Sequence, residues 1–168
     1  YPLRRQRQMC IRDRLTAVLI SSFAQVPAIF LAASYSDRHG RRGIYKMGAL
    51  AMAVWGFCVF PLMDTGSLLA ITLALTVGQI FIGMMYGPQA ALLTELFSTE
   101  VRYSGASLGY QLGAIVGGGM APIAATALIA AFGSAIWVSA YIALASLLTW
   151  LSLHLLGENH QADLEKVA

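Results

Sequence analysis

Five long apolar stretches, separated by short polar segments, make up most of the 168-residue chain. A helix needs about 20 apolar residues to cross the hydrocarbon core of a bilayer. We expect helices of that length over Leu15–Ser34, Ile44–Met63, Leu68–Leu93, Tyr103–Ala131 and Ala135–Leu156. The third should break at Gly87-Pro88, and the fourth, longer than a bilayer requires, should tilt or kink near Pro122. The pattern predicts an all-α, polytopic membrane protein with five transmembrane helices.

Composition favours lipid as the main solvent of this chain. Apolar residues make up 58% and charged residues 11%, whereas soluble domains carry about 25% charged residues. The mean hydropathy is +0.67. Cys10 and Cys58 do not form a disulfide framework, and no metal-ligand spacing, nucleophile–base pair or phosphate-binding loop occurs. We therefore expect no enzyme, no metal site, no cofactor and no nucleic-acid partner.

Positive charges after residue 14 gather at alternate connections between the expected helices. All of them lie in or beside the first connection (35–43), in the third (98–102) or in the C-terminal tail, namely Arg38, Arg41, Arg42, Lys46, Arg102 and Lys166. The second connection (64–67) and the fourth (132–134) carry none. The positive-inside rule then places the first and third connections and the C-terminus in the cytoplasm, with the chain in a cell (inner) membrane.

Residues 1–14 depart from this charge rule. They hold five arginines and one aspartate on the side that the rule assigns to the exterior. The segment has no helical periodicity and no apolar core of a secretory signal, and it resembles translated sequencing-adapter read-through. We expect a non-native basic head over 1–14, a membrane domain over 15–156 and a polar cytoplasmic tail over 157–168. The alternative is a short native loop.

The first connection reads Y-S-D-R-H-G-R-R-G, with Asp37 at a helix end and Gly40 permitting a positive φ in a tight turn. It resembles the D-R-x-G-R-R motif of the major facilitator superfamily, which lies between the second and third helices and again between the eighth and ninth. Ala33 and Tyr35 stand where that motif usually has glycine and leucine.

A longer match covers residues 86–122, with E-L-F-S-T-E-V-R-Y-S-G-A-S at 95–107. This stretch resembles the tenth and eleventh helices of the metabolite:proton symporter family, within the same superfamily. The resemblance extends over residues 15–156. It implies helices eight to twelve, an incomplete six-helix C-terminal half whose partner, helices one to seven, is missing. It also implies that the first and fourth helices face that half, the third lines the cavity, and the second and fifth face lipid.

Charges at the cytoplasmic helix ends are partly desolvated and need partners. Asp37, Arg41, Arg42, Glu95 and Arg102 lie at one depth, so we expect them to form a network. In the superfamily that this chain resembles, such clusters close one face during alternating access. By that resemblance the candidate gating residues are Asp37, Arg38, Gly40, Arg41, Arg42, Glu95 and Arg102. The alternative is a set of solvated charges that only fixes topology.

Glycines recur every four residues along the fourth expected helix, at Gly105, Gly109, Gly113 and Gly117. This spacing places them on one face, where another backbone could approach closely. We interpret the stripe as the contact between two transporter halves, or as ordinary packing within one bundle. Gly83 and Gly87 form a shorter version on the third helix. On the second helix, Met52 stands between Gly48 and Gly56, so we expect no close contact there.

Polar residues within the spans are candidates for a substrate cavity: Gln25, Gln79, Tyr86, Gln89, Tyr110 and Gln111. Interhelical hydrogen bonding is the alternative for each of them. No Asp, Glu, Lys or Arg lies deep within a span. Proton coupling normally requires a buried ionisable group, so a coupling acid would lie in the missing half.

The function that the resemblance implies is proton-coupled transport of a small organic solute, an organic acid or zwitterion, by alternating access. The expected partners are the lipid bilayer, the missing half, the solute and a proton. Two alternatives stay open. One is a sugar-type facilitator of the same superfamily, against which the L-G-E-N-H ending at 156–160 counts. The other is a standalone five-span membrane scaffold.

Overall fold

The computed structural model describes residues 2–156, with side chains from residue 12 onward. Within this range the chain is helical, with short connections between the helices. The helices are α1 (Pro2–His39), α2 (Arg41–Asp64), α3 (Leu68–Glu95), α4 (Arg102–Gly113), the π-helix η1 (Ala114–Gly119), α5 (Met120–Phe132) and α6 (Ile136–Leu155). Because α4, η1 and α5 form one continuous 31-residue span, this part of the chain has five apolar helices long enough to cross a membrane. The predicted all-α fold with five spans is confirmed.

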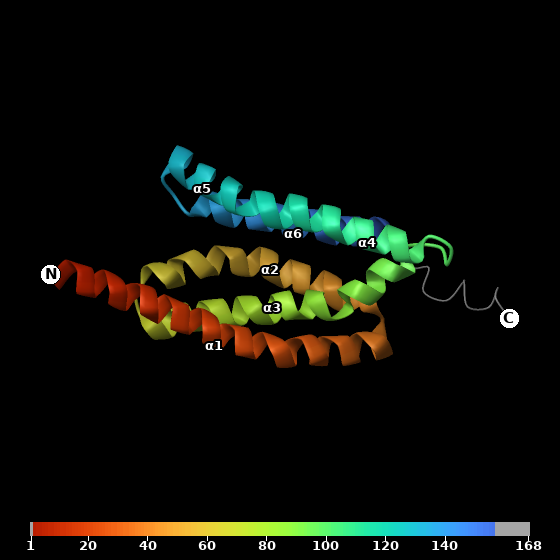
Figure 1. Ribbon diagram of the computed structural model, residues 1–168, viewed down its shortest axis with the longest axis horizontal. Coiled ribbons are helices and arrows are strands. Elements are labelled where there is room, and N and C mark those ends of the chain that lie inside the picture. Colours follow the sequence, from red (N-terminus) through yellow and green to blue (C-terminus); the bar gives the residue numbers. More distant parts are fainter. Residues whose placement is uncertain (1, 157–168) are drawn as a thin grey trace.

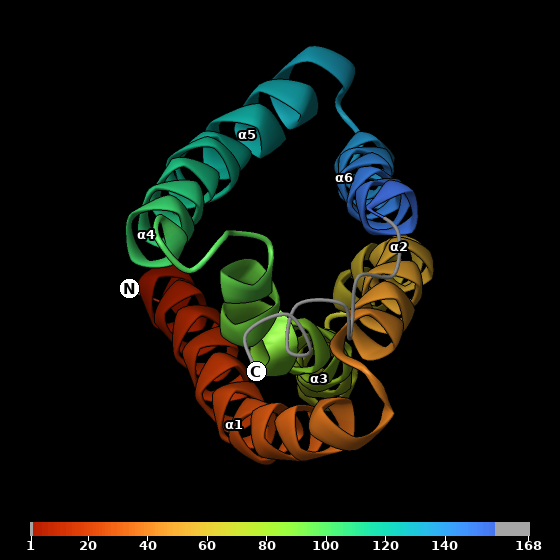
Figure 2. The same ribbon diagram turned by 90° about the vertical axis from the view of Figure 1, so that its right-hand side faces the viewer.

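Four helices form the best-packed part of the molecule. α3 packs against α1 on one side and against α2 on another, and α2 in turn packs against α6. Figure 1 shows these helices running side by side, and Figure 2, seen from the end, shows α2 between α3 and α6. α5 contacts α6, and α4 contacts α3 near their shared connection. The middle of the fourth span therefore lacks neighbours within the described residues.

Glycines on α3 set the close approach of α1. A Cβ at Gly83 would lie 3.0 Å from the Cβ of Ala28, and a Cβ at Gly87 would lie 2.8 Å from both Ala33 N and Ile29 O. Backbone atoms cannot move aside as a side chain can, so glycine is required where the helices meet at this distance. Gly83 and Gly87 thus set the close contact between α1 and α3.

The expectation that α2 makes no close contact is wrong. A Cβ at Gly48 would lie 2.9 Å from Met85 Cγ and 3.3 Å from Phe81 O of α3. A Cβ at Gly56 would lie 3.2 Å from Ile142 Cγ2 of α6. Eight helical residues turn the chain by about 80° beyond two full turns. The two glycines therefore serve two different neighbours, and Met52 between them interrupts nothing.

The helices extend further than hydropathy indicated. α1 begins at Pro2 rather than Leu15 and continues through Tyr35 to His39, so the first connection is Gly40 alone. Gly40 has φ of +96°, the left-handed region that favours glycine. The polar residues of 34–39 contain no helix breaker, so the helix ends only where the backbone reverses. Residues 1–14 thus include a helical part, and whether they are native stays a prediction.

Prolines distort the spans less than expected. α3 stays helical through Gly87-Pro88, so the predicted break is wrong, although its last turns are inclined to the rest of the helix (Figure 1). In the fourth span the irregularity lies at η1, one turn before Pro122. Proline clashes with the carbonyl four residues earlier, here at Gly118. A π-helical turn over the glycines 117–119 relieves that clash.

Candidate functional site

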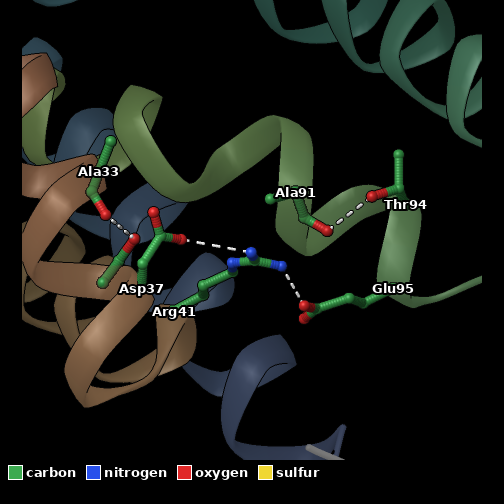
Figure 3. Close-up of polar contacts among 7 residues, drawn as sticks. Ala33, Asp37, Arg41, Ala91, Thr94 and Glu95 are labelled. Atoms are coloured by element: carbon green, nitrogen blue, oxygen red, sulfur yellow. Dashed lines mark hydrogen bonds and ion pairs between the residues drawn. The ribbon is translucent and has the colours of Figure 1, made fainter. Parts of the chain in front are cut away.

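One arginine joins the ends of three helices. Arg41 Nη2 lies 3.3 Å from Asp37 Oδ1, at the end of α1. Arg41 Nη1 donates to Glu95 Oε1, on the last residue of α3. Figure 3 shows the guanidinium lying between the two carboxylates. These three side chains are referred to below as the Arg41 cluster.

Backbone geometry places the Arg41 cluster. The reversal at Gly40 puts the last turn of α1 and the first turn of α2 next to one another, so Asp37 and Arg41 are separated by four residues across the turn. α3 ends at Glu95, close to this turn, because Gly83 and Gly87 hold α3 against α1 over the preceding helical turns. Side-chain charge and helix packing therefore act together at this end of the bundle.

The cluster is partly exposed rather than buried. The side chains of Arg41, Glu95 and Asp37 are 26%, 39% and 62% exposed. Burial of a charge pair carries a large desolvation cost, whereas an exposed pair contributes about 0–1 kcal/mol. The intermediate exposure suits a contact that fastens three helices and can still be broken and re-formed.

The other predicted members of the network have different partners. Arg42 Nη1 donates to the backbone carbonyl of Leu156, 3.3 Å away, beyond the end of α6. Arg102 Nε donates to the carbonyl of Phe97, 3.4 Å away, within its own connection. Arg38 lines a separate groove on α1. The structure thus brings three of the five network residues together, and a gating role for them stays a prediction.

The contact of Arg42 with Leu156 has no signal in the sequence. A backbone carbonyl becomes an acceptor at the end of any helix, where its intrahelical donor is missing. The interaction therefore depends on α6 ending beside α2, which only the three-dimensional packing determines. It ties the start of α2 to the end of α6.

The glycine stripe of the fourth span is largely uncovered. A Cβ at Gly109, Gly113 or Gly117 would meet nothing within 4 Å in the described residues. Gly105 differs, because a Cβ there would lie 2.5 Å from the ring of Phe97. Three of the four positions are therefore free for a neighbour, and the interdomain role predicted for the stripe is untested.

The six candidate cavity residues do not gather in one place. Gln25, Gln79 and Gln89 are partly buried, whereas Tyr86, Tyr110 and Gln111 are exposed. Gln25 lies on α1, Tyr110 and Gln111 lie on α4, and the others lie on α3. None of the six lines the one groove resolved among the described residues. A role for them in binding solute stays a prediction.

The fold and the Arg41 cluster are those of a multi-pass membrane protein with a group of paired charges at one end of a helical bundle. The family model described as Major Facilitator Superfamily matches residues 15–166. This chain belongs to the Major Facilitator Superfamily, a family of transport proteins rather than enzymes. No solved structure matches the chain.

Several curated proteins are similar to this chain. A Haemophilus influenzae protein named for metabolite transport is 38% identical over 157 residues, which are 92% of this chain and 35% of that protein. The Escherichia coli inner membrane metabolite transport protein YhjE is 33% identical, over 80% of this chain and 30% of its own length. The Escherichia coli shikimate transporter is 33% identical, over 76% and 30%. The chain spans about a third of the length of these relatives.

Two further predictions lie partly or wholly outside the described residues. The polar tail 157–168, with Lys166, falls there entirely, as do the side chains of the arginines before residue 12. The cytoplasmic position of the C-terminus therefore rests on the charge rule alone.

Proposed function

We propose that this chain is part of a secondary transporter that carries a small organic acid or zwitterion together with a proton by alternating access. The observation that carries the proposal is the Arg41 cluster, which joins α1, α2 and α3 at the end of the bundle that the charge rule makes cytoplasmic. In this proposal the cluster is a latch, closed while the cytoplasmic side is closed and broken when that side opens.

The energetics of the cluster suit this role. The free energies of the closed and open states should differ by no more than a few kcal/mol. A larger difference would leave the less stable state almost unpopulated. Partly exposed ion pairs supply energies of about that size or less. Arg41 holds two carboxylates from two different helices, so separating the helix ends breaks both contacts together.

The names of the relatives support the solute class. They include a shikimate transporter and a citrate-proton symporter of Klebsiella pneumoniae, the latter 36% identical over 67% of this chain. Between residues 15 and 155, every Asp, Glu, Lys and Arg lies in a connection or within two turns of the end of a span. We therefore propose that the proton-carrying group lies in helices outside this chain, in a larger protein of a bacterial inner membrane whose further half completes the solute site.

Transport by the complete protein tests the proposal. The protein would be reconstituted in liposomes and offered radiolabelled shikimate, citrate and proline with an imposed inward proton gradient. We expect uptake of at least one such solute, abolished when a protonophore collapses the gradient. Uptake indifferent to the protonophore would overturn the proton coupling, and no uptake of any organic acid or zwitterion would overturn the solute class.

Cysteine accessibility tests the latch directly. Gln89→Cys, placed on α3 in a background without Cys10 and Cys58, would be labelled in inside-out vesicles by an impermeant maleimide. We expect Arg41→Gln to raise the labelling rate, because loss of the latch favours the state open to the cytoplasm. Arg42→Gln is the matched control, since Arg42 donates to the Leu156 carbonyl and has no ion pair with Asp37 or Glu95 among the described residues. Equal labelling in Arg41→Gln and the parent would exclude the latch while leaving transport itself untouched.

A further inference from the structure

A groove of about 730 Å³ runs along α1 and is lined by none of the three side chains of the Arg41 cluster. α1 supplies most of its wall, from Ala24 to His39, while α3 adds Ile80 and Met84 and α2 adds Ile44. This volume lies in the range of about 300–1,000 Å³ that is usual for ligand sites. The groove lies on a helix long and apolar enough to span a membrane, where an apolar surface meets either lipid or another helix.

The lining of the groove changes character along its length. The part nearer the middle of α1 is apolar, with Pro27, Ala28 and Leu31 from α1 and Ile80 and Met84 from α3. The other end of the groove carries Tyr35, Arg38 and His39. The rings of Tyr35 and His39 stack with centroids 4.3 Å apart and planes 13° apart, which holds both rings at this rim.

Arg38 supplies positive charge at the rim. The other two arginines of the D-R-x-G-R-R motif have partners. Arg41 binds two carboxylates, and Arg42 donates to the Leu156 carbonyl. Among the residues that the structure describes, the Arg38 guanidinium has no ion pair or hydrogen bond, and the residue is exposed. A guanidinium of this kind binds phosphate oxygens through paired N–H donors.

The length of the groove matches one leaflet of a bilayer. Fifteen residues of helix separate Ala24 from His39, which is about 22 Å along α1. Half of a bilayer measures about 20–22 Å, of which about 15 Å is hydrocarbon. An acyl chain lying against the apolar part would therefore bring a headgroup phosphate to the level of Arg38.

We propose that this groove binds an anionic phospholipid of the cytoplasmic leaflet, with an acyl chain along Pro27, Leu31 and Met84 and its phosphate held by Arg38. An anionic headgroup is favoured over a zwitterionic one because the rim presents an unpaired cation with an adjacent histidine and no carboxylate among the lining residues. The site is separate from solute transport and does not require it.

Native mass spectrometry of the complete protein, released from detergent without solute or gradient, tests the proposal. Phosphatidylglycerol and phosphatidylethanolamine with identical acyl chains would be titrated in parallel. We expect Arg38→Gln to weaken retention of phosphatidylglycerol about fivefold, the effect of one cation near a headgroup, and to weaken phosphatidylethanolamine less, because its ammonium group partly offsets the charge of its phosphate. Lys46→Gln, which removes one positive charge at a similar depth outside the lining, should retain both lipids as the parent does.

A second variant pair tests the acyl part of the groove. Ala24→Phe adds a ring at the apolar end of the groove, and Ala145→Phe adds the same ring to an exposed position on α6. We expect Ala24→Phe to lower retention of both lipids and Ala145→Phe to lower neither. Phosphatidylglycerol retained equally by the parent, Arg38→Gln and Ala24→Phe would overturn the proposal. A photo-crosslinker at Leu31 that captures a peptide of the protein instead of lipid would also overturn it, because a helix would then occupy the groove.

Discussion

Glycines meet opposite surroundings in two regions of this molecule. In the packed region, where α1, α2, α3 and α6 meet, Gly48, Gly83 and Gly87 each bring another helix within contact distance. In the fourth span, Gly109 and Gly113 face nothing within 4 Å among the described residues. Both regions contain glycines four residues apart on a helix face, so spacing alone does not tell which glycines are covered.

The difference teaches what a small-residue face requires. In lipid, helices associate through close van der Waals packing, and a glycine face contributes only when a partner backbone lies against it. The packed glycines have that partner within the chain. Gly109, Gly113 and Gly117 of the fourth span have no such partner among the described residues, and the comparison predicts opposite responses to added side chains.

The largest effect is expected at Gly87, in the packed region. Gly87→Leu would place a side chain against Ala33 N and Ile29 O, both 2.8 Å from the new Cβ. Neither backbone atom can yield without parting α1 from α3, so we expect a loss of about 3 kcal/mol or more in the free energy of unfolding, the upper end of overpacking costs. Thermal melting of the purified complete protein in detergent measures it.

The control for this substitution lies in the other region. Gly113→Leu adds the same side chain at a position where a Cβ meets nothing within 4 Å in residues 2–156, and a much smaller loss of stability is expected. A melting temperature for Gly87→Leu equal to that of the parent would contradict the assigned contact between α1 and α3.

The Arg41 cluster, at one end of the packed region, should give the next largest effect. Arg41→Gln leaves Asp37 and Glu95 without their shared cation, which we expect to destabilise the closed bundle by about 1–2 kcal/mol. A double-mutant cycle with Glu95→Gln isolates the pair, since coupled residues give non-additive losses. Strict additivity in the melting curves would show that the two side chains do not interact.

Hydropathy predicted the five spans because lipid requires about 20 apolar residues in each, but it did not predict where the helices end. The helix α1 continues through the polar residues 35–39 and stops only at Gly40. α3 continues through Pro88. Helix ends depend on backbone geometry and caps rather than on the edge of the apolar run.

The sequence identified only part of the candidate site, namely the contacts between charged side chains. Charged residues of opposite sign at one depth predicted a network of five side chains, of which Asp37, Arg41 and Glu95 are in contact. Contacts made with backbone atoms cannot be recognised from residue types. Examples are the hydrogen bond of Arg42 with the Leu156 carbonyl and the close approach of Gly48 to the Phe81 carbonyl. These contacts follow from which helices are neighbours, and neighbour relations arise from the packing of the whole bundle.

A smaller effect is expected at Trp55, between α2 and α3. Its indole Nε1 donates to the carbonyl of Ala74, 3.1 Å away, and its ring lies edge-on to Phe81. Trp55→Phe keeps most of the aromatic volume and removes the donor, so we expect a loss of about 0.5–1.5 kcal/mol. Melting curves measure it, with Trp137→Phe as control, because Trp137 stacks on Phe132 at the α5–α6 turn, outside this contact. Equal shifts in both variants would show that the indole bond adds nothing beyond ring packing.

The smallest effect in this chain is expected at Gly109, and it sharpens the comparison most. Alanine favours a helix over glycine by up to about 1 kcal/mol, and a Cβ at Gly109 meets nothing within 4 Å among the described residues. Gly109→Ala should therefore leave the melting temperature unchanged or slightly raised, while Gly83→Ala, whose Cβ would lie 3.0 Å from the Cβ of Ala28, should lower it. If the stripe is the contact between two halves, Gly109→Ala will nevertheless slow solute uptake in liposomes, because the added methyl group alters an interface that must move during transport. Unchanged uptake with unchanged stability would instead show that the Gly109 position faces lipid.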